Sequence, residues 1–353
     1  MSTLYVKELQ TAIRAVHLAS LATKRLLPSK DKGSQPKADR SPVTIADYAS
    51  QALLIAAVHH DFPEDHILGE ESAAELRKNQ TLCDQVWHLI STTLDQSVDT
   101  GASLYGELKD KDDMFRYIDM GGDELGGVKG RVWMLDPVDG TAAFLSGGQY
   151  AVCLALVEDG EQKVGVVGCP NAPFDVAQVK ETVVDSDGYG SLLSAVKGHG
   201  TFVWKMGVER LGPPRKIFHK QPTAIRIVQP SNSAYDFGGR RKVADKLGAE
   251  WPGTMLWSSQ TRFVALALGE GNAQIAFRKR RDYHSCVWDA AGGVLIFEEA
   301  GGRVTDVEGK PLDFRQGRRL EKNSGIVAAL SGIHDRVLSV VREVDREPIN
   351  DGV

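Results

Sequence analysis

Cysteine is scarce in this chain. Of 353 residues only four are cysteines, namely Cys83, Cys153, Cys169 and Cys286. They are far apart and form no Cys-X-X-Cys pair, so neither a disulfide framework nor a zinc site is indicated. The simplest interpretation is a cytoplasmic protein with reduced thiols.

Long apolar runs are also missing. No stretch of about 18 apolar residues occurs, so we expect no membrane span. The N-terminal sequence lacks the order of segments that marks a signal peptide. Instead, Val6, Leu9, Ile13 and Val16 follow the spacing of a helix.

No charge of one sign dominates. The chain carries 42 Lys and Arg against 47 Asp and Glu, a net charge of −5, which argues against a general nucleic-acid or membrane-surface binder. Hydrophobic residues make up 42% and charged residues 25%, as in ordinary globular proteins. The length suggests two domains or one large one.

Apolar periodicity predicts the elements of the first half. Helices are expected over 1–27 and 44–63, and the acidic stretch 73–126 is expected to be mainly helical. Strands are expected over 66–72 and 131–140, the second one ending in a turn. We therefore expect an N-terminal part in which helices and strands are mixed.

The polar segment 28–42 lies between the first two expected helices. It is rich in Pro, Lys and Ser, which is typical of a loop. This composition suggests that the segment moves. Since the segment precedes Asp47, it could act as a lid.

A hairpin over 149–171 and further strands over 191–204 are expected to extend the same sheet. The sequence GPPRK at 212–216 marks a plausible boundary between an N-terminal α+β domain, 1–215, and a C-terminal α/β domain, 216–353. In the second domain strands alternate with helices. The expected strands are AIRIVQP, TMLW, AQIAFR and GRVTD, and the expected helices lie near 238–247, 260–268, 289–300 and 333–345.

What stands out is WMLDPVDGTAAFL, residues 133–145, where Asp136 and Asp139 interrupt an apolar run. Two buried carboxylates without positive charge would cost several kcal/mol each. A cation is therefore expected beside them, with Pro137 helping to fix the turn that aims both carboxylates the same way. The alternative is a pair of helix-capping aspartates, since Asp139 could begin a helix with Gly140.

Further acids in apolar surroundings favour the metal interpretation. Asp47 lies in an expected helix, Glu70 and Glu71 are adjacent in ILGEES, and Asp289 lies in VWDAAGG, so these acids come from three separate segments. Hard cations such as Mg²⁺ prefer oxygen ligands. Several carboxylates that converge in this way are typical of a multi-metal phosphoryl-transfer site.

A helix beginning at 140–141 would add an anion site. Its free N–H groups would face the metals and could bind phosphate, with Gly140 and the Thr141 hydroxyl close by. The nine histidines form no HExxH motif, so no histidine-based metal or catalytic pair is indicated.

The motifs GEES, LDPVDGT and VWDAAGGVLIFEEAGG, in this order, resemble the signature of the inositol monophosphatase superfamily of Mg²⁺-dependent, lithium-sensitive phosphatases. Within it the chain is most similar to the 3′(2′),5′-bisphosphate nucleotidase branch of fungi and plants. Supporting stretches such as SPVTIADYASQALL and SSQTRFVALALGEG spread the resemblance over most of the chain. It implies alternating α-β-α-β-α layers.

The resemblance also implies a metal set. Glu70, Asp136 and the carbonyl of Val138 would hold a first Mg²⁺ ion. Asp136, Asp139 and Asp289 would hold a second, and a third, weaker ion would rest on Glu70. Asp47 and Thr141 would form the catalytic pair that orients and deprotonates the attacking water.

Residues implied to contact the substrate surround the metals. They are Gly140, Thr141, Ser259, Arg262, Arg278, Tyr283 and Asp289. Arginine suits such a role because it binds phosphate through two donors. The chain departs from the family at a set of positions that we call the substrate rim. Ala142 and Ala143 stand where the family commonly has Lys-Gly, and Ser146 stands where it commonly has an arginine. Arg262 stands where a lysine is common, and no histidine occurs in 229–237.

The implied activity is removal of the 3′-phosphate from adenosine 3′,5′-bisphosphate and from 3′-phosphoadenylyl sulfate, in sulfate assimilation and salt tolerance. Inhibition by Li⁺ is implied, with Na⁺ and Ca²⁺ as further candidates. We expect a monomer acting on a small nucleotide, with no nucleic-acid partner. The alternatives are an inositol phosphate phosphatase and a nucleotide-binding sensor without turnover.

Overall fold

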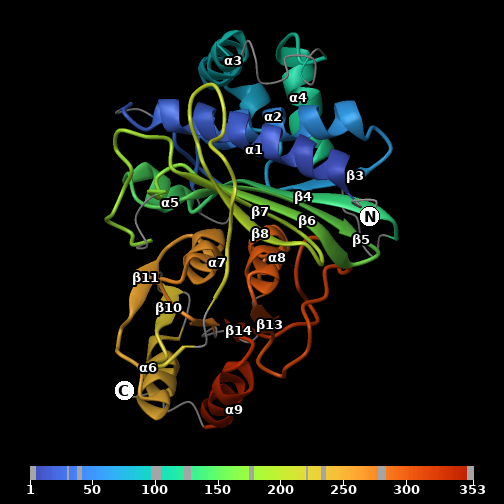
Figure 1. Ribbon diagram of the computed structural model, residues 1–353. Coiled ribbons are helices and arrows are strands. Elements are labelled where there is room, and N and C mark those ends of the chain that lie inside the picture. Colours follow the sequence, from blue (N-terminus) through green and yellow to red (C-terminus); the bar gives the residue numbers. More distant parts are fainter. Residues whose placement is uncertain are drawn as a thin grey trace.

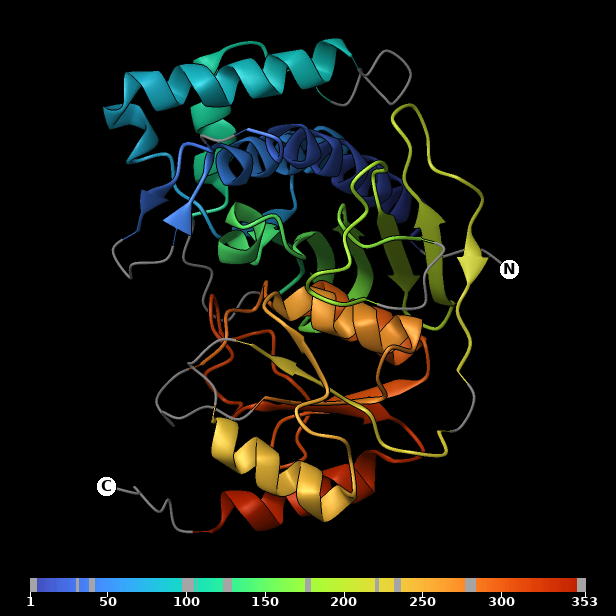
Figure 2. The same cartoon turned by 90° about the vertical axis from the view of Figure 1, so that its left-hand side faces the viewer.

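The protein is built of alternating layers of helices and sheets (Figures 1 and 2). In the computed structural model, residues 5–29, 32–37, 42–96, 105, 107–122, 129–174, 179–219, 222–231, 236–276 and 284–347 are described. Helices cover the outer face of a large sheet, two helices separate it from a smaller sheet, and two more cover the far side of that one. The predicted α-β-α-β-α layering is confirmed.

The first helical layer contains α1 (Val6–Leu26) and α2 (Ile45–Asp61), which confirm the first two predicted helices. Thr44 caps α2 through a capping box with Asp47, whose carboxylate accepts from the Thr44 backbone. All residues of α2 from Ile45 to Val58 are buried, because it packs between other helices and the sheet.

The predicted helical stretch 73–126 is interrupted. It contains a short 3₁₀ turn (Leu76–Lys78), α3 (Gln80–Asp95) and α4 (Lys111–Met120). Asn79 and Asp110 cap the two α-helices by accepting hydrogen bonds from backbone N–H groups. Each of the two helices therefore begins directly after a capping residue. Among the described helices, none is long and apolar enough to cross a membrane.

The larger sheet has seven strands in sequence order: β3 (His66–Gly69), β4 (Arg131–Asp139), β5 (Ala151–Glu158), β6 (Glu161–Cys169), β7 (Ser191–Val196), β8 (Gly200–Lys205) and β9 (Arg215–Lys216). Only β3 and β4 run parallel; the other neighbours are antiparallel. The predicted hairpin is β5–β6. Its turn residues Asp159 and Gly160 both have positive φ, as a tight hairpin requires.

The smaller sheet has the order β11-β10-β12-β14-β13. Its strands are β10 (Ile227–Pro230), β11 (Thr254–Leu256), β12 (Ala273–Ala276), β13 (Gly302–Thr305) and β14 (Ile326–Leu330). Strand β14 is not among the predicted elements: IVAAL is too short and uniformly apolar for its period to show a strand. The division into domains at 215 and 216 stays a prediction.

Four helices accompany this sheet: α6 (Phe237–Leu247), α7 (Ser259–Leu268), α8 (Ala291–Glu299) and α9 (His334–Asp345). Helices α7 and α8 lie between the two sheets, and α6 and α9 cover the outer side (Figure 1). In the predicted lid, β1 (Gln35–Pro36) pairs with β2 (Pro42–Val43), which the sequence analysis expected only as loop.

Helix α8 approaches β6 closely at a pair of glycines. A Cβ atom on Gly165 would lie 2.8 Å from the carbonyl oxygen of Gly292, which is nearer than side-chain carbons come to backbone. Glycine at this position therefore lets α8 lie on the large sheet, and α8 follows directly after Asp289.

We predict that Gly165→Val lowers the free energy of unfolding by about 2 kcal/mol or more, because α8 must move off the sheet. Urea denaturation measures this. The control is Gly238→Ala on the exposed surface of α6, which we expect to leave stability within about 1 kcal/mol of the parent. An unchanged urea midpoint for Gly165→Val would contradict the prediction, because it would show that α8 accommodates the larger side chain without loss of stability.

Candidate active site

A β-bulge brings the two aspartates of LDPVDGT to one face of the sheet. In a regular strand, residues three apart point to opposite faces. Here Asp136 pairs with Cys153 and Asp139 with Ala151, so three steps along β4 match two along β5. The extra residue returns Asp139 to the face of Asp136. Pro137 lies inside the bulge, where a ladder N–H is not needed.

Asp289 completes a carboxylate cluster. One ligand oxygen from each of Asp136, Asp139 and Asp289 lies within 4.8 Å of the others. Burial raises the pKa of Asp136 well above its usual range, and the charges of Glu70, Asp139 and Asp289 raise it further. The structure thus brings together, from β4 and from the turn before α8, three of the predicted metal ligands.

Asp139 is held by the start of α7. It accepts hydrogen bonds from the Ser258 hydroxyl at 2.6 Å, from the Ser259 N–H at 3.3 Å and from the Gln260 N–H at 2.5 Å. Burial raises the pKa of Asp139, while these donors and the charge of Arg262 oppose the rise. An aspartate of the large sheet is therefore oriented by a helix of the second half of the chain.

Gln260 is a residue that the sequence analysis missed. Its side-chain amide donates to the carbonyl of Trp288 at 2.6 Å and accepts from the N–H of Gly293 at 2.7 Å. Through its own N–H it also holds Asp139, so it joins that carboxylate to the turn carrying Asp289. Its side chain is fully buried in α7, which the structure shows and the local sequence does not mark.

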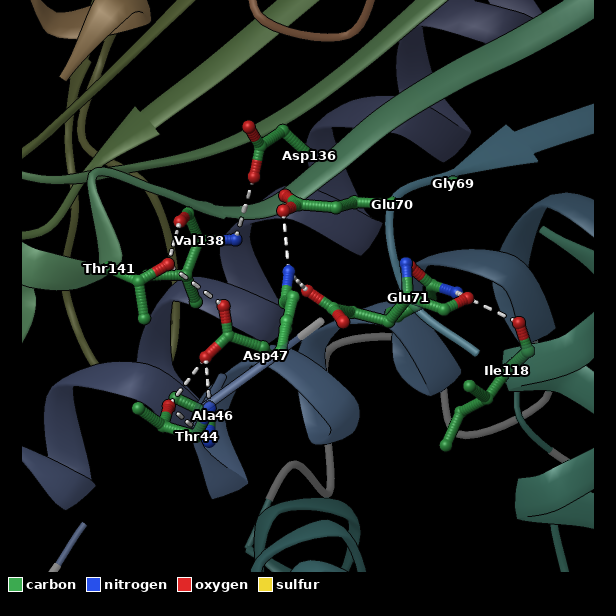
Figure 3. Close-up of polar contacts among 12 residues, drawn as sticks. Thr44, Ala46, Asp47, Gly69, Glu70, Glu71, Ile118, Asp136, Val138 and Thr141 are labelled. Carbon is green, nitrogen blue, oxygen red and sulfur yellow. Dashed lines mark hydrogen bonds and ion pairs between the residues drawn. The ribbon is translucent and has the colours of Figure 1, made fainter. Parts of the chain in front are cut away.

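Asp47 and Thr141 meet as predicted (Figure 3). The Thr141 hydroxyl lies 3.2 Å from Asp47 Oδ1 and 3.1 Å from the carbonyl oxygen of Val138. The other oxygen of Asp47 accepts from the N–H of Thr44 at 2.8 Å and from its hydroxyl at 2.6 Å. Burial raises the pKa of Asp47 to about 6, although the hydrogen bond from Thr44 opposes the rise.

A short helix, α5 (Thr141–Leu145), starts where the sequence predicts one. Gly140 precedes it with φ near 91°, and a Cβ there would lie 2.8 Å from the Cβ of Ser258, so glycine is required. The helix has only five residues, so its dipole is that of a little more than one turn. The predicted phosphate contacts of Gly140 and Thr141 stay predictions.

Glu70 lies beside a lysine that the sequence analysis treated only as part of a loop. The ammonium of Lys37 is 2.6 Å from Glu70 Oε1 and 2.5 Å from Glu71 Oε1. Burial disfavours the charge on Lys37, but Glu70 and Glu71 outweigh it and raise the pKa of this lysine. The segment after β1 thus places a positive charge on one of the predicted metal ligands.

Gln51 fixes the chain that carries Glu70 and Glu71. Its amide nitrogen donates to the carbonyls of Glu71 at 2.7 Å and Ile118 at 2.8 Å, and its oxygen accepts from the N–H of Glu71 at 2.9 Å. Because Gln51 lies one helical turn beyond Asp47 on α2, the same helix positions both groups.

The substrate rim is only partly described. Arg262 is buried, and its guanidinium donates to the carbonyls of Leu256 and Trp257 and to the Ser259 hydroxyl. These bonds stabilise the turn between β11 and α7. Arg278 and Tyr283 lie outside the described residues, so the roles predicted for them, and for Ser259 and Arg262 toward a substrate, stay predictions.

The donor set fits a hard divalent cation. Asp136, Asp139 and Asp289 offer only carboxylate oxygens, which Mg²⁺ prefers. Like charges this close, and buried, need positive charge to be stable in their ionised form. Neither soft thiolate nor imidazole belongs to the cluster that the described residues form.

Known proteins share both sequence and fold with this chain. The inositol monophosphatase family matches residues 2–346. A 3′(2′),5′-bisphosphate nucleotidase of Emericella nidulans is 39% identical over 96% of this chain and 99% of its own length. One of Schizosaccharomyces pombe is 38% identical, covering 96% and 95%. The solved structure of a Thermotoga maritima IMPase has a TM-score of 0.60 at 19% identity, covering 97% and 99%.

We predict that the metal-free protein loses stability as the pH rises. The carboxyl of Asp47 has a higher pKa in the folded protein than in the unfolded chain. Its contribution to the free energy of unfolding is therefore complete below about pH 4 and is lost as the pH rises past about 6. For Asp47 alone, the loss in the free energy of unfolding is on the order of 3 kcal/mol. Asp136, Asp139 and Glu71 act in the same direction.

The measurement is the melting temperature in EDTA at about pH 5 and about pH 7.5, repeated with Mg²⁺. Asp47→Asn is the control, because it keeps the shape and removes the titration. We expect a smaller loss of melting temperature in Asp47→Asn than in the parent, and a smaller loss with Mg²⁺ than without. Equal pH dependence in both proteins would contradict the assignment.

Proposed function

Because the chain belongs to the inositol monophosphatase family, we propose that it is a phosphoric monoester hydrolase that converts adenosine 3′,5′-bisphosphate to AMP and phosphate. The observation that carries this proposal is the buried aspartate cluster, in a chain that matches bisphosphate nucleotidases over nearly its full length. We include 3′-phosphoadenylyl sulfate as a second substrate, with a role in sulfate assimilation and salt tolerance.

We propose Mg²⁺ as the cofactor, in two to three ions. Asp136, Asp139 and Asp289 would hold it, with Glu70 and the Val138 carbonyl as further ligands. When bound, Mg²⁺ supplies positive charge against the charge that develops on the phosphoryl oxygens. Inhibition by Li⁺, and by Na⁺ and Ca²⁺ as further candidates, belongs to the same proposal, as do a cytoplasmic location and a monomeric state.

Asp47 and Thr141 carry the proton chemistry in this proposal. The hydroxyl of Thr141 donates toward Asp47 Oδ1 at 3.2 Å, which leaves its oxygen free to accept a proton from the attacking water. A pKa of about 6 suits Asp47 to take up that proton near neutral pH. Thr44 keeps the second oxygen of Asp47 occupied and so fixes which oxygen faces Thr141.

Substrate choice depends on the rim. The nucleotide proposal uses Arg262, Arg278 and Ser259 for the second phosphate and Tyr283 for the base or ribose. An inositol phosphate is the alternative substrate, because Ala142 and Ser146 stand where the family commonly has basic residues. A sensor without turnover is disfavoured, since the cluster and the Asp47–Thr141 contact are all present.

The test is phosphate release with Mg²⁺ from adenosine 3′,5′-bisphosphate and from inositol 1-phosphate, each with and without Li⁺. We expect a strong preference for the nucleotide, and loss of that activity with Li⁺. Asp136→Asn is the inactive control. A preference for inositol 1-phosphate would overturn the proposed substrate, and no release from either would overturn the proposed activity.

We predict that Thr141→Val lowers kcat by about 100-fold or more, because it keeps the shape of the side chain but removes the proton relay. Thr141→Ser should recover most of the rate. Steady-state kinetics at saturating Mg²⁺ measure both variants, and calorimetric Mg²⁺ binding shows whether the metal site is intact. A valine variant within about twofold of the parent would exclude the hydroxyl from the reaction.

A further inference from the structure

Arg318 reaches from the smaller sheet to the larger one. It lies in the connection between β13 and β14, yet its guanidinium donates to the carbonyls of Gly69 at 2.9 Å, Glu70 at 3.2 Å and Gly121 at 3.3 Å. The N–H of Gly69 donates to the same Gly121 carbonyl at 2.8 Å. Arg318 therefore joins the end of β3 to the residue that follows α4. It also holds the backbone of Glu70.

The other side of Arg318 packs on the segment that carries Asp289. Its guanidinium carbon lies 4.5 Å from the ring centre of Trp288, the residue before Asp289. The backbone carbonyl of Arg318 also accepts from the N–H of Val287 at 3.1 Å. Main chain and side chain of one residue thus both fix the strand-like segment that leads into the cluster.

Arginine is suited to this position. Its planar group offers several donors in one plane and a flat face for an aromatic ring, whereas lysine offers a point charge. The guanidinium of Arg318 donates to three carbonyls and lies over the ring of Trp288. Gln260 donates to the backbone carbonyl of Trp288 at 2.6 Å, so the backbone and the ring of the residue before Asp289 are both held.

We propose that Arg318 is a positioning residue that sets the spacing between Glu70 and Asp289. Glu70 follows β3, and Asp289 precedes α8. On the Glu70 side, Arg318 donates to the carbonyls of Gly69 and Glu70. On the Asp289 side, it accepts from the N–H of Val287 and lies over the ring of Trp288. The proposal rests on the proposed function in taking both carboxylates as metal ligands. In this role Arg318 stabilises the bound metals as a group, although it holds none of them.

The test is Mg²⁺ binding measured by isothermal titration calorimetry on the full chain without substrate. We expect Arg318→Ala to weaken binding about tenfold, as loss of a residue that orients metal ligands does. Arg318→Lys should recover part of the affinity, since it restores the charge but not the fork of donors. The matched control is Arg315→Ala, in the same connection, where the exposed arginine pairs only with Asp313 among the contacts described.

Kinetics give the second measurement. In Arg318→Ala the Mg²⁺ concentration for half-maximal rate should rise about tenfold, while KM for the nucleotide at saturating Mg²⁺ stays within about twofold. A merely structural role would instead lower the melting temperature in EDTA and leave Mg²⁺ affinity unchanged. Unchanged Mg²⁺ affinity in Arg318→Ala overturns the proposal.

If Arg318→Ala does not fold, Arg318→Lys decides alone: affinity equal to that of the parent overturns the proposal, and a loss of severalfold supports it. Failure of the proposed function is separate, because it would appear as no phosphate release by the parent protein, while calorimetry still compares Mg²⁺ binding among the variants.

Discussion

Repulsion among Asp136, Asp139 and Asp289 is the constraint on which the arrangement around them depends. The three carboxylates lie within 4.8 Å of one another, and two of them are buried. They would move apart or become protonated unless the surrounding residues held them in place and supplied hydrogen bonds or positive charge. This support comes from both halves of the chain. The bulge in β4 fixes the two strand aspartates, the start of α7 donates to Asp139, and the turn before α8 holds Asp289.

The same need explains three polar side chains that lie beside the acids. Gln51, Gln260 and Arg318 each bond to backbone groups next to a carboxylate, and none of them belongs to the set of acids itself. Gln51 and Gln260 are buried, and Arg318 is half-buried. Polar groups are costly to bury unless they are hydrogen-bonded, so the presence of the two glutamines in the interior points to geometry that the site requires. Lys37 is the complementary case, because it brings positive charge to Glu70 and Glu71.

The layered fold and most of the helices and strands could be predicted from the sequence. The resemblance to a known family gave the layers, and strong apolar patterns with local capping residues gave most of the elements. Sequence reasoning also reached the acids of the cluster and the Asp47–Thr141 contact. It missed the bulge, since Pro137 suggested a turn, and it missed Lys37, Gln260 and Arg318. Their roles depend on contacts between segments far apart in the chain, which spacing within one segment does not encode.

The seating of α7 and α8 on the large sheet has a consequence for how damage to this protein would be recognised. Asp139 belongs to one half of the chain but takes its donors from the other, and the glycine contact at Gly165 sets how near that other half lies. A change far from the acids that shifts these helices by a fraction of an ångström would first appear as a change in metal affinity. Distant lesions and active-site lesions would then share one phenotype, and only a melting curve without metal would separate them.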